Sequence, residues 1–426
     1  MLLLTGLSTA LLIIAVPLGI VMAASALAFI LLDPMLSPVT VFRAFFNFLS
    51  KYTLMAVPFF ILAGFLMEKT GLIEKLFKFA DAVIGWVPGG FGFATLLAAV
   101  IFGAISGSST AMAAAMGLIA FPEMVKRGYP KWLAAGCIAS GGGIAILIPP
   151  SILFILYGVL TETSIVDLFF AGIVPGLLLA VSDALVLMFF AWYLGLPSGK
   201  FSWGFLAEAT KEAWPALLMP VILLGGLYGG LFTPTEAGAA AAGYALVYGL
   251  IAKRGAFVRE LIPVTVRALN LTAVIFLLLG CVGIFQFVMA NQGWAQHLTE
   301  WVVSLNMSPM GFLVVLLIVL LFLSMFLSGI AILVLTVPVF FPVAMSLGLD
   351  PVWLAVLVAL AMEMGVIIPP VGLNLFAVSG VTRVPLHEVI KGSSPFLVTD
   401  GTVLVLVMFF PVLALAVPQM LVKAAF

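Results

Sequence analysis

Residues 141–151 (GGGIAILIPPS) and residues 365–374 (GVIIPPVGLN) interrupt two long apolar stretches with residues that disfavour a helix. A glycine in a helix interior costs about 1 kcal/mol. A proline removes a backbone hydrogen bond and clashes with the preceding turn. The surrounding stretches, about 131–160 and 352–380, are long enough to cross a bilayer. We therefore predict two broken helices, each unwound near the middle of the membrane.

The composition places the whole chain in a membrane. Of the 426 residues, 65% are hydrophobic and only 8% are charged, whereas soluble domains carry about 25% charged residues. Most of the surface must therefore face lipid or other helices. The formal net charge of zero gives no bias toward nucleic acid, and the isolated Cys137, Cys281, His297 and His387 indicate neither a disulfide framework nor a metal site.

Other apolar stretches predict further membrane spans. The N-terminal run lacks a basic leading region and is too long for a signal peptide, so we expect it to be the first retained span. The amphipathic segments 70–88 and 293–308 are predicted to lie at the membrane interface. The predicted spans are 6–32, 53–68, 166–194, 215–232, 234–252, 268–290 and 396–417.

Two apolar stretches contain a Ser/Gly break at their centre. They are residues 92–120, centred on GAISGSST, and residues 312–343, centred on LSGIA. The helices beside each break are expected to be only about ten residues long, which is too short for a span. Each stretch is therefore predicted to be a re-entrant hairpin.

The second half of the sequence repeats the first at an offset near 220. The predicted fold is thus an all-α polytopic membrane protein with repeats at 1–214 and 233–426 around an intervening helix at 215–232. An even number of crossings per repeat, followed by one extra helix, inverts the second copy, as in many secondary transporters. The matching positions are Phe121-Pro122 with Phe341-Pro342, Ile148-Pro149-Pro150 with Ile368-Pro369-Pro370, and Gly172 and Pro175 with Gly392 and Pro395.

The basic residues suggest how the chain is oriented. Of the 17 Lys and Arg residues, all but Arg43, Lys51 and Lys423 fall on one side of this arrangement. Positive charge marks the cytoplasmic side. We therefore expect the N-terminus inside, the C-terminus outside, and the two hairpins entering from opposite faces.

The tip of the first hairpin is the strongest candidate for a binding site. Ser106-Gly107-Ser108-Ser109-Thr110 offers four hydroxyls in five residues. Backbone freed by a helix break persists in a bilayer only where protein or a polar cavity satisfies it. Carbonyls and hydroxyls suit Na⁺, and helix N-termini favour an anion. The alternative is that these small residues only allow close helix packing.

The second half offers less hydroxyl chemistry. Its candidates are Ser328-Gly329, Gly365, Pro369-Pro370 and Asn374, and Asn374 could instead make a hydrogen bond between helices. Acids within a membrane are functional candidates by default.

Four acids fall within or beside the predicted spans. Glu236 and Glu363 are the best placed, with Asp183 and Asp400 below them. Glu236 could equally cap its helix, because Thr233-Pro-Thr-Glu resembles a capping box.

The chain lacks the parts of an ATPase or an enzyme. It has no phosphate-binding loop of the form GxxxxGK[ST], and its polar loops are too short for an ATPase domain. Energy must therefore come from an ion gradient or from a partner protein. No catalytic constellation is apparent, so we expect a protein that is not an enzyme. No Arg lies within a predicted break, so no fixed cationic contact for a carboxylate is visible.

Five segments together resemble the large membrane subunit of tripartite ATP-independent periplasmic (TRAP) transporters. They are GAISGSSTAMAAAMG, FPEMVKRGYPKWLAAG, GGGIAILIPPSI, LFTPTEAGAAAAGYA and IIPPVGLNLFAVSG. The resemblance implies uptake of an organic anion, commonly a C4-dicarboxylate or sialic acid, with Na⁺ as the coupling ion and no other cofactor. It implies a scaffold and an elevator-type transport domain, in a multi-pass protein of the bacterial inner membrane.

The resemblance also implies partners and site residues. The partners are a separately encoded small four-helix membrane subunit and a periplasmic substrate-binding protein. The implied substrate-binding residues are Ser106, Ser108, Ser109, Thr110, Pro150, Ser151 and Asn374. The implied Na⁺ ligands are Ser106, Gly107, Ser109, Gly142, Ser328, Gly329, Gly365 and Pro369.

Two other interpretations remain at this point. A stand-alone divalent-anion/Na⁺ symporter without a binding protein would share the repeated hairpins. Such carriers typically bear an Asn-Thr pair in the hairpin tips, where this chain has SGSST and LSGIA. The third interpretation is a membrane scaffold or an intramembrane enzyme.

Overall fold

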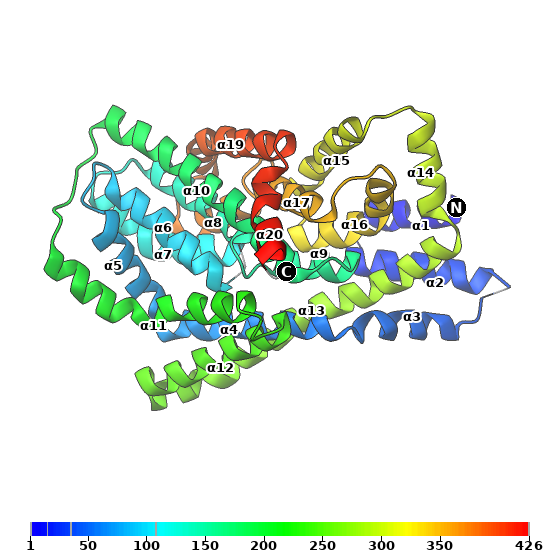
Figure 1. The fold of residues 1–426 in the computed structure, drawn as a ribbon, viewed down its shortest axis with the longest axis horizontal. Coiled ribbons are helices and arrows are strands. Elements are labelled where there is room, and N and C mark those ends of the chain that lie inside the picture. The colour runs from blue at the N-terminus through cyan, green and yellow to red at the C-terminus, as the bar shows by residue number, and fades with distance from the viewer. Residues whose placement is uncertain (1, 15, 35, 107–108, 425–426) are drawn as a thin grey trace.

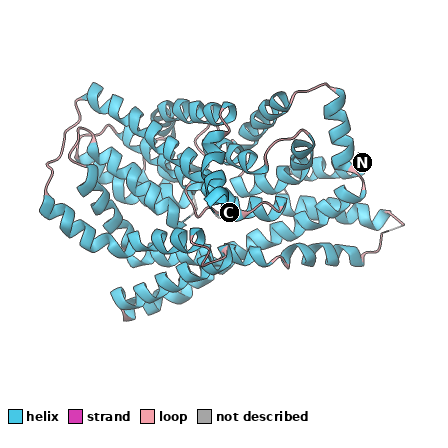
Figure 2. Cartoon of the chain, viewed as in Figure 1, coloured by secondary structure: helices cyan, strands magenta, loops and turns pink. Residues whose placement is uncertain are grey.

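The computed structural model describes the chain except residues 1, 15, 35, 107–108 and 425–426. The described part is built of helices, with short loops and no strand (Figure 2). In chain order the elements are α1 (Leu2–Ile13), α2 (Leu18–Leu32), α3 (Val39–Leu49), η1 (Tyr52–Met55), α4 (Ala56–Thr70), α5 (Leu72–Ile84), α6 (Gly90–Ser106), α7 (Ser109–Lys126), α8 (Lys131–Leu147), α9 (Ile152–Thr161), α10 (Ile165–Leu194), α11 (Trp203–Tyr228), α12 (Pro234–Lys253), α13 (Gly255–Asn291), α14 (Trp294–Ser304), α15 (Pro309–Ser324), α16 (Gly329–Ser346), α17 (Pro351–Gly365), α18 (Leu373–Thr382), α19 (Leu386–Phe409) and α20 (Val412–Ala424).

The helices form two groups that lie one above the other in Figure 1. The long-helix layer, α3, α4, α12 and α13, runs along the lower edge of the view. The hairpin body, α6 to α10 and α15 to α19, lies above it. Within the described residues, six helical segments are long and apolar enough to span a membrane, and the bent pair α14–α15 would make a seventh. The prediction of a polytopic helical membrane protein is confirmed.

Two predicted spans are wrong because a proline divides each of them. Residues 6–32 form two helices: α1 ends at Ile13, and α2 begins after Pro17. These helices fold back on each other, so that Ser8 Oγ donates to Ser25 Oγ at 2.9 Å. The crossing count treated this segment as one span, so it no longer fixes the side of the N-terminus. Residues 396–417 are divided similarly, because α19 begins ten residues earlier, at Leu386, and ends just before Phe410-Pro411.

Both predicted hairpins have the expected helix–break–helix form. α6 ends at Ser106 and α7 begins at Ser109, and α15 and α16 flank the break at 325–328. Their helices contain 16 to 18 residues rather than about ten, because the helical backbone continues through Pro122, Pro338 and Pro342. The two hairpins lie in opposite halves of Figure 1. Their entry from opposite membrane faces stays a prediction.

Both predicted broken helices are present, but the glycine run does not break the first one. α8 continues as a regular helix through Gly141, Gly142 and Gly143 to Leu147, and α9 begins at Ile152. The second break separates Gly365 from Leu373. Both breaks contain a cis Pro-Pro peptide bond, at Pro149-Pro150 and Pro369-Pro370. The prolines therefore mark the breaks, whereas the glycines serve another purpose.

Helices α8 and α19 cross at two glycines. A methyl group on Gly136 would overlap the backbone of Gly392, and a methyl on Gly392 would overlap the Trp132 carbonyl. Small residues allow helix backbones to approach closely in membranes, where van der Waals packing drives association. This crossing fixes α19 against the most buried helix of the hairpin body.

The crossing gives a prediction about stability. Gly136→Ala should lower the Tm of the detergent-solubilised full chain by several degrees, because overpacking costs about 1–3 kcal/mol. Gly243→Ala is the matched control, because a methyl group at Gly243 on α12 would meet nothing within 4 Å. Equal Tm values for the two variants would contradict the backbone contact at Gly136.

Candidate functional site

Three helices meet at the tip of the first hairpin. Asn374, the second residue of α18, donates from Nδ2 to Ser109 Oγ on α7 at 2.7 Å and to the Ala139 carbonyl on α8 at 3.0 Å. Asn374 is fully buried, and its Oδ1 has no hydrogen-bond partner. The predicted interhelical hydrogen bond of Asn374 is therefore present. A buried, unpartnered amide oxygen also remains at the same point.

The glycines of α8 make room for two polar side chains. A Cβ atom on Gly142 would lie 2.6 Å from Asn374 Nδ2. One on Gly143 would overlap the carboxyl group of Glu363 from α17. Any larger side chain at either position would push the polar group away from α8. Clearance, rather than unwinding, is the physical reason for this glycine run.

The second hairpin tip packs against the other halves of the broken helices. Ser328 caps α16 by accepting from the Ala331 N–H at 3.4 Å. A Cβ on Gly329 would lie 3.7 Å from Leu153 on α9 and 3.9 Å from Met362 on α17. The first tip thus contacts α8 and α18, whereas the second contacts α9 and α17.

Asn374, which the sequence analysis grouped with Ser109 among the implied substrate residues, thus lies at the first hairpin tip although it belongs to the second half of the chain. Each tip contacts the first segment of the broken helix in its own half of the chain and the second segment of the broken helix in the other half. Gly365 does stay near the second hairpin, packed against Ser324 at the end of α15.

The remaining predicted site residues are dispersed. Gly107 and Ser108 and the side chain of Ser106 lie outside the described residues. Pro150 and Ser151 are buried, and Ser151 Oγ caps α9 by accepting from the Phe154 N–H at 3.5 Å. Pro369 is only half-buried. The roles predicted for these residues in binding stay predictions.

Glu236 caps a helix, which was one of its two predicted roles. Its Oε2 accepts from the Thr233 N–H at 2.8 Å, and its own N–H donates to Thr233 Oγ1 at 3.3 Å. This reciprocal pair is a complete capping box at the start of α12. Glu236 Oε2 thus serves the cap of α12.

A cavity of about 840 Å³ lies between the long-helix layer and the first hairpin. Thr110 of the hairpin tip lines it together with Ala114 of α7 and Ile152 of α9. Gly64 and Phe65 of α4 and Arg267 of α13 line the facing wall. The cavity joins one predicted substrate residue to a cation that sequence analysis did not single out.

Arg267 was missed because it lies in an unbroken helix. It is the 13th residue of the 37-residue α13, far from any predicted break. Its Nη1 lies 3.3 Å from Glu68 Oε1 on α4, and its guanidinium group stacks 4.3 Å from the centroid of the Phe65 ring. The only sequence signal was a lone arginine leading into an apolar run.

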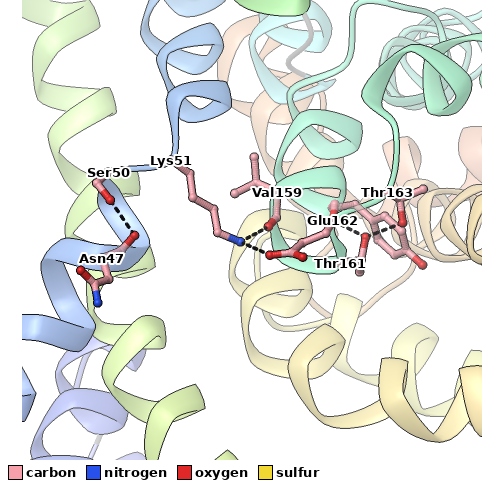
Figure 3. A network of polar contacts seen from close by, with 8 residues as sticks. Asn47, Ser50, Lys51, Val159, Thr161, Glu162 and Thr163 are labelled. Atoms are coloured by element: carbon pink, nitrogen blue, oxygen red, sulfur yellow. Dashed lines mark hydrogen bonds and ion pairs between the residues drawn. The ribbon is translucent and has the colours of Figure 1, made fainter.

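A second polar contact joins the layer to the body through Lys51, which precedes η1 (Figure 3). Lys51 Nζ lies 3.0 Å from Glu162 Oε1 and donates to the Val159 carbonyl at 3.1 Å. The extended lysine side chain bridges the gap to the end of α9. Because the Glu162 side chain is 80% exposed, the ion pair adds at most about 1 kcal/mol. Breaking and re-forming such a contact therefore changes the free energy only slightly.

Comparison with known proteins agrees with this architecture. The sequence model of the family described as "Tripartite ATP-independent periplasmic transporter, DctM component" matches residues 5–413. The C4-dicarboxylate TRAP transporter large permease protein DctM of Pseudomonas aeruginosa is 41% identical over 374 residues, covering 87% of each chain. The sialic acid TRAP transporter large permease protein SiaM of Vibrio cholerae is 34% identical, covering 96% of each chain.

A solved structure shares the fold. The YdaH transporter of Alcanivorax borkumensis superimposes with a TM-score of 0.62, covering 87% of this chain and 86% of that one, at 16% sequence identity. This likeness concerns the fold alone. With the family match along nearly the whole chain, the protein is a multi-pass protein of the bacterial inner membrane, and it belongs to the DctM family of large TRAP transporter permease subunits.

Proposed function

We propose that this permease subunit takes up an organic anion together with Na⁺, after a periplasmic binding protein has delivered the anion. A small four-helix membrane subunit would complete the transporter. The observation that carries the proposal is the cavity between the layer and the body, which places Arg267 opposite Thr110. A cation on one wall and hydroxyl chemistry on the other suit a carboxylate.

The coupling ion would bind at the hairpin tips. Asn374 Oδ1 is buried without a partner, beside Ser109 Oγ and the Ala139 carbonyl. These are hard oxygen donors of the kind that bind Na⁺ in broken-helix transporters. The other proposed ligands are Ser106, Gly107, Gly142, Ser328, Gly329, Gly365 and Pro369.

Na⁺ binding would come before substrate binding. A bound cation would order the hairpin tip and would partly offset the cost of burying an anion. The bound Na⁺ would contact Asn374 Oδ1, which accepts no hydrogen bond in this structure. The proposed substrate contacts are Ser106, Ser108, Ser109, Thr110, Pro150, Ser151 and Asn374.

The substrate class follows from the cavity and from the relatives. The names of the two relatives mention C4-dicarboxylate and sialic acid, which are both carboxylates. Arg267 can present a planar pair of N–H donors to a carboxylate. Its present partner is the carboxylate of Glu68. An incoming anion would therefore compete with Glu68 for the guanidinium group.

Transport would move the hairpin body against the long-helix layer, as in an elevator. The layer would act as the scaffold and would bind the small subunit. The ion pair of Lys51 with Glu162 joins the layer to the body, and because it is exposed it contributes little to holding the body in its present position. We further propose that the repeats, at 1–214 and 233–426 around the helix at 215–232, are inverted copies.

The first prediction concerns coupling and partners. In liposomes that contain the full chain, the small subunit and the binding protein, uptake should require an inward Na⁺ gradient. Radiolabelled C4-dicarboxylate and sialic acid are the first substrates to test. Uptake that persists without the Na⁺ gradient would contradict coupling. Uptake by the full chain alone would instead favour the stand-alone symporter.

The second prediction concerns the hairpin-tip site. Asn374→Leu should raise the Na⁺ concentration for half-maximal uptake about fivefold or more, because it removes the proposed oxygen ligand and a lost buried polar contact costs about 1–3 kcal/mol. Asn270→Leu is the matched control, because Asn270 is exposed on α13. An unchanged Na⁺ dependence in a folded Asn374→Leu protein would remove Asn374 from the Na⁺ site.

The third prediction concerns the cavity. Arg267→Met should raise the KM for an anionic substrate by about tenfold or more, because a charged hydrogen bond contributes about 1.5–3 kcal/mol. Arg259→Met, an exposed position on the same helix, should leave KM unchanged. Glu68→Gln combined with Arg267→Met separates the loss of the cation from the exposure of an unpaired Glu68. A KM equal to that of the Arg259→Met control would show that the anion does not contact Arg267.

A further inference from the structure

Two aspartates from different helices meet inside the hairpin body. Asp183, on α10, is 0% exposed, and Asp400, on α19, is 1% exposed. Their carboxyl groups are close enough to share a hydrogen bond if one of them carries a proton. Asp183 also accepts a hydrogen bond from Ser140 Oγ on α8, at 2.8 Å from Oδ2. The contact joins three helices: α8, α10 and α19.

The hydrogen bond between the two carboxyl groups requires a proton. An ionised carboxylate is only an acceptor, so two ionised groups cannot hydrogen-bond to each other. Ser140 supplies one donor to Asp183 Oδ2, and no other described group donates a hydrogen bond to Asp183 Oδ1 or Asp400 Oδ2. Two neighbouring negative charges in a dry interior would also repel each other strongly. At least one of the two acids must therefore be neutral.

No positive side chain compensates the pair. Within the described residues, none of the ion pairs formed by Lys, Arg or His involves Asp183 or Asp400. The titratable groups that face the pair are Cys137 on α8 and Glu363 on α17. Neither can carry a positive charge.

Glu363 adds an independent observation. It is 1% exposed, its Oε2 has no partner, and its carboxyl group is close enough to both aspartates to interact electrostatically. A third buried acid without a counter-ion makes ionisation of the pair still less favourable.

A proton suits this geometry better than a metal ion. In the part of the chain that the structure describes, no group of three or more acids, cysteines or histidines converges closely enough to hold a metal. A proton needs only two facing oxygens, and the shared hydrogen bond supplies them. We propose that Asp183 and Asp400 form a proton-binding site in the hairpin body, separate from the Na⁺ sites at the hairpin tips.

The proton would hold α10 against α19. Loss of the proton would place two negative charges side by side, without a counter-ion, between packed helices. The folded state should therefore lose stability as the pH rises and the site empties. The stability of the Asp183→Asn/Asp400→Asn variant should lack this dependence on pH.

Infrared spectroscopy of the purified full chain tests the proposal directly. At about pH 7.5, exposed carboxyl groups are ionised, since their pKa values lie near 4. The wild type should still show the carbonyl band of a protonated acid, and Asp183→Asn/Asp400→Asn should lose part of that band. Asp167→Asn, a more accessible position on α10, should retain the wild-type band. A wild-type spectrum without a protonated acid would overturn the proposal, and this outcome needs no variant to fold.

Thermal unfolding across pH gives the second measurement. As the pH rises from about 4, where free carboxyl groups ionise, to the pH at which the buried site loses its proton, the Tm of the wild type and of Asp167→Asn should fall more steeply than the Tm of the double variant. Parallel Tm curves, or identical infrared bands in the wild type and the double variant, would overturn the site. Neither measurement uses transport, so the result is independent of Na⁺ coupling and of the substrate.

Discussion

The hydrogen bond from Asn374 Nδ2 to Ser109 Oγ ties the second broken helix to the first hairpin in the interior of the protein. A bilayer supplies no water to satisfy a freed backbone or a polar side chain, so each helix break must find its partners within the protein. This requirement brings residues 265 positions apart in the sequence into contact. It also explains why each hairpin tip is enclosed by helices from both halves of the chain.

Helix α8 is the element on which these contacts converge. Gly136, Ser140 and Gly143 are spaced four and three residues apart, so they lie along one face of the helix. Gly136 contacts α19, Ser140 donates to Asp183 on α10, and Gly143 leaves room for Glu363 on α17. Ala139 and Gly142 receive Asn374 on the neighbouring face. Small residues on α8 thus allow four other helices to approach it closely, and three of them bring a polar side chain.

The boundary between the long-helix layer and the hairpin body has a different character. Its wall carries charged side chains that are partly exposed, at Arg267 and Glu68 beside the cavity and at Lys51 and Glu162 at a separate contact. Exposed ion pairs contribute little to stability. Buried networks such as that of Asn374 are costly to break. This difference between the buried network and the exposed ion pairs agrees with the proposed movement of the hairpin body as a unit.

The sequence by itself determined the membrane class and the positions of both hairpins and both proline breaks, and it left the capping box at Glu236 as one of two roles. These features follow from local chemistry: the shortage of charge, the missing N–H group of proline, and capping side chains three residues apart. Only the tertiary structure decided that Asn374 meets Ser109, that Arg267 enters the cavity, and that Asp183 meets Asp400. It also turned the expected unwinding at the glycine run into clearance for neighbouring side chains. Those outcomes depend on which helix faces pack together, and residues far apart along the chain leave no local pattern of such packing.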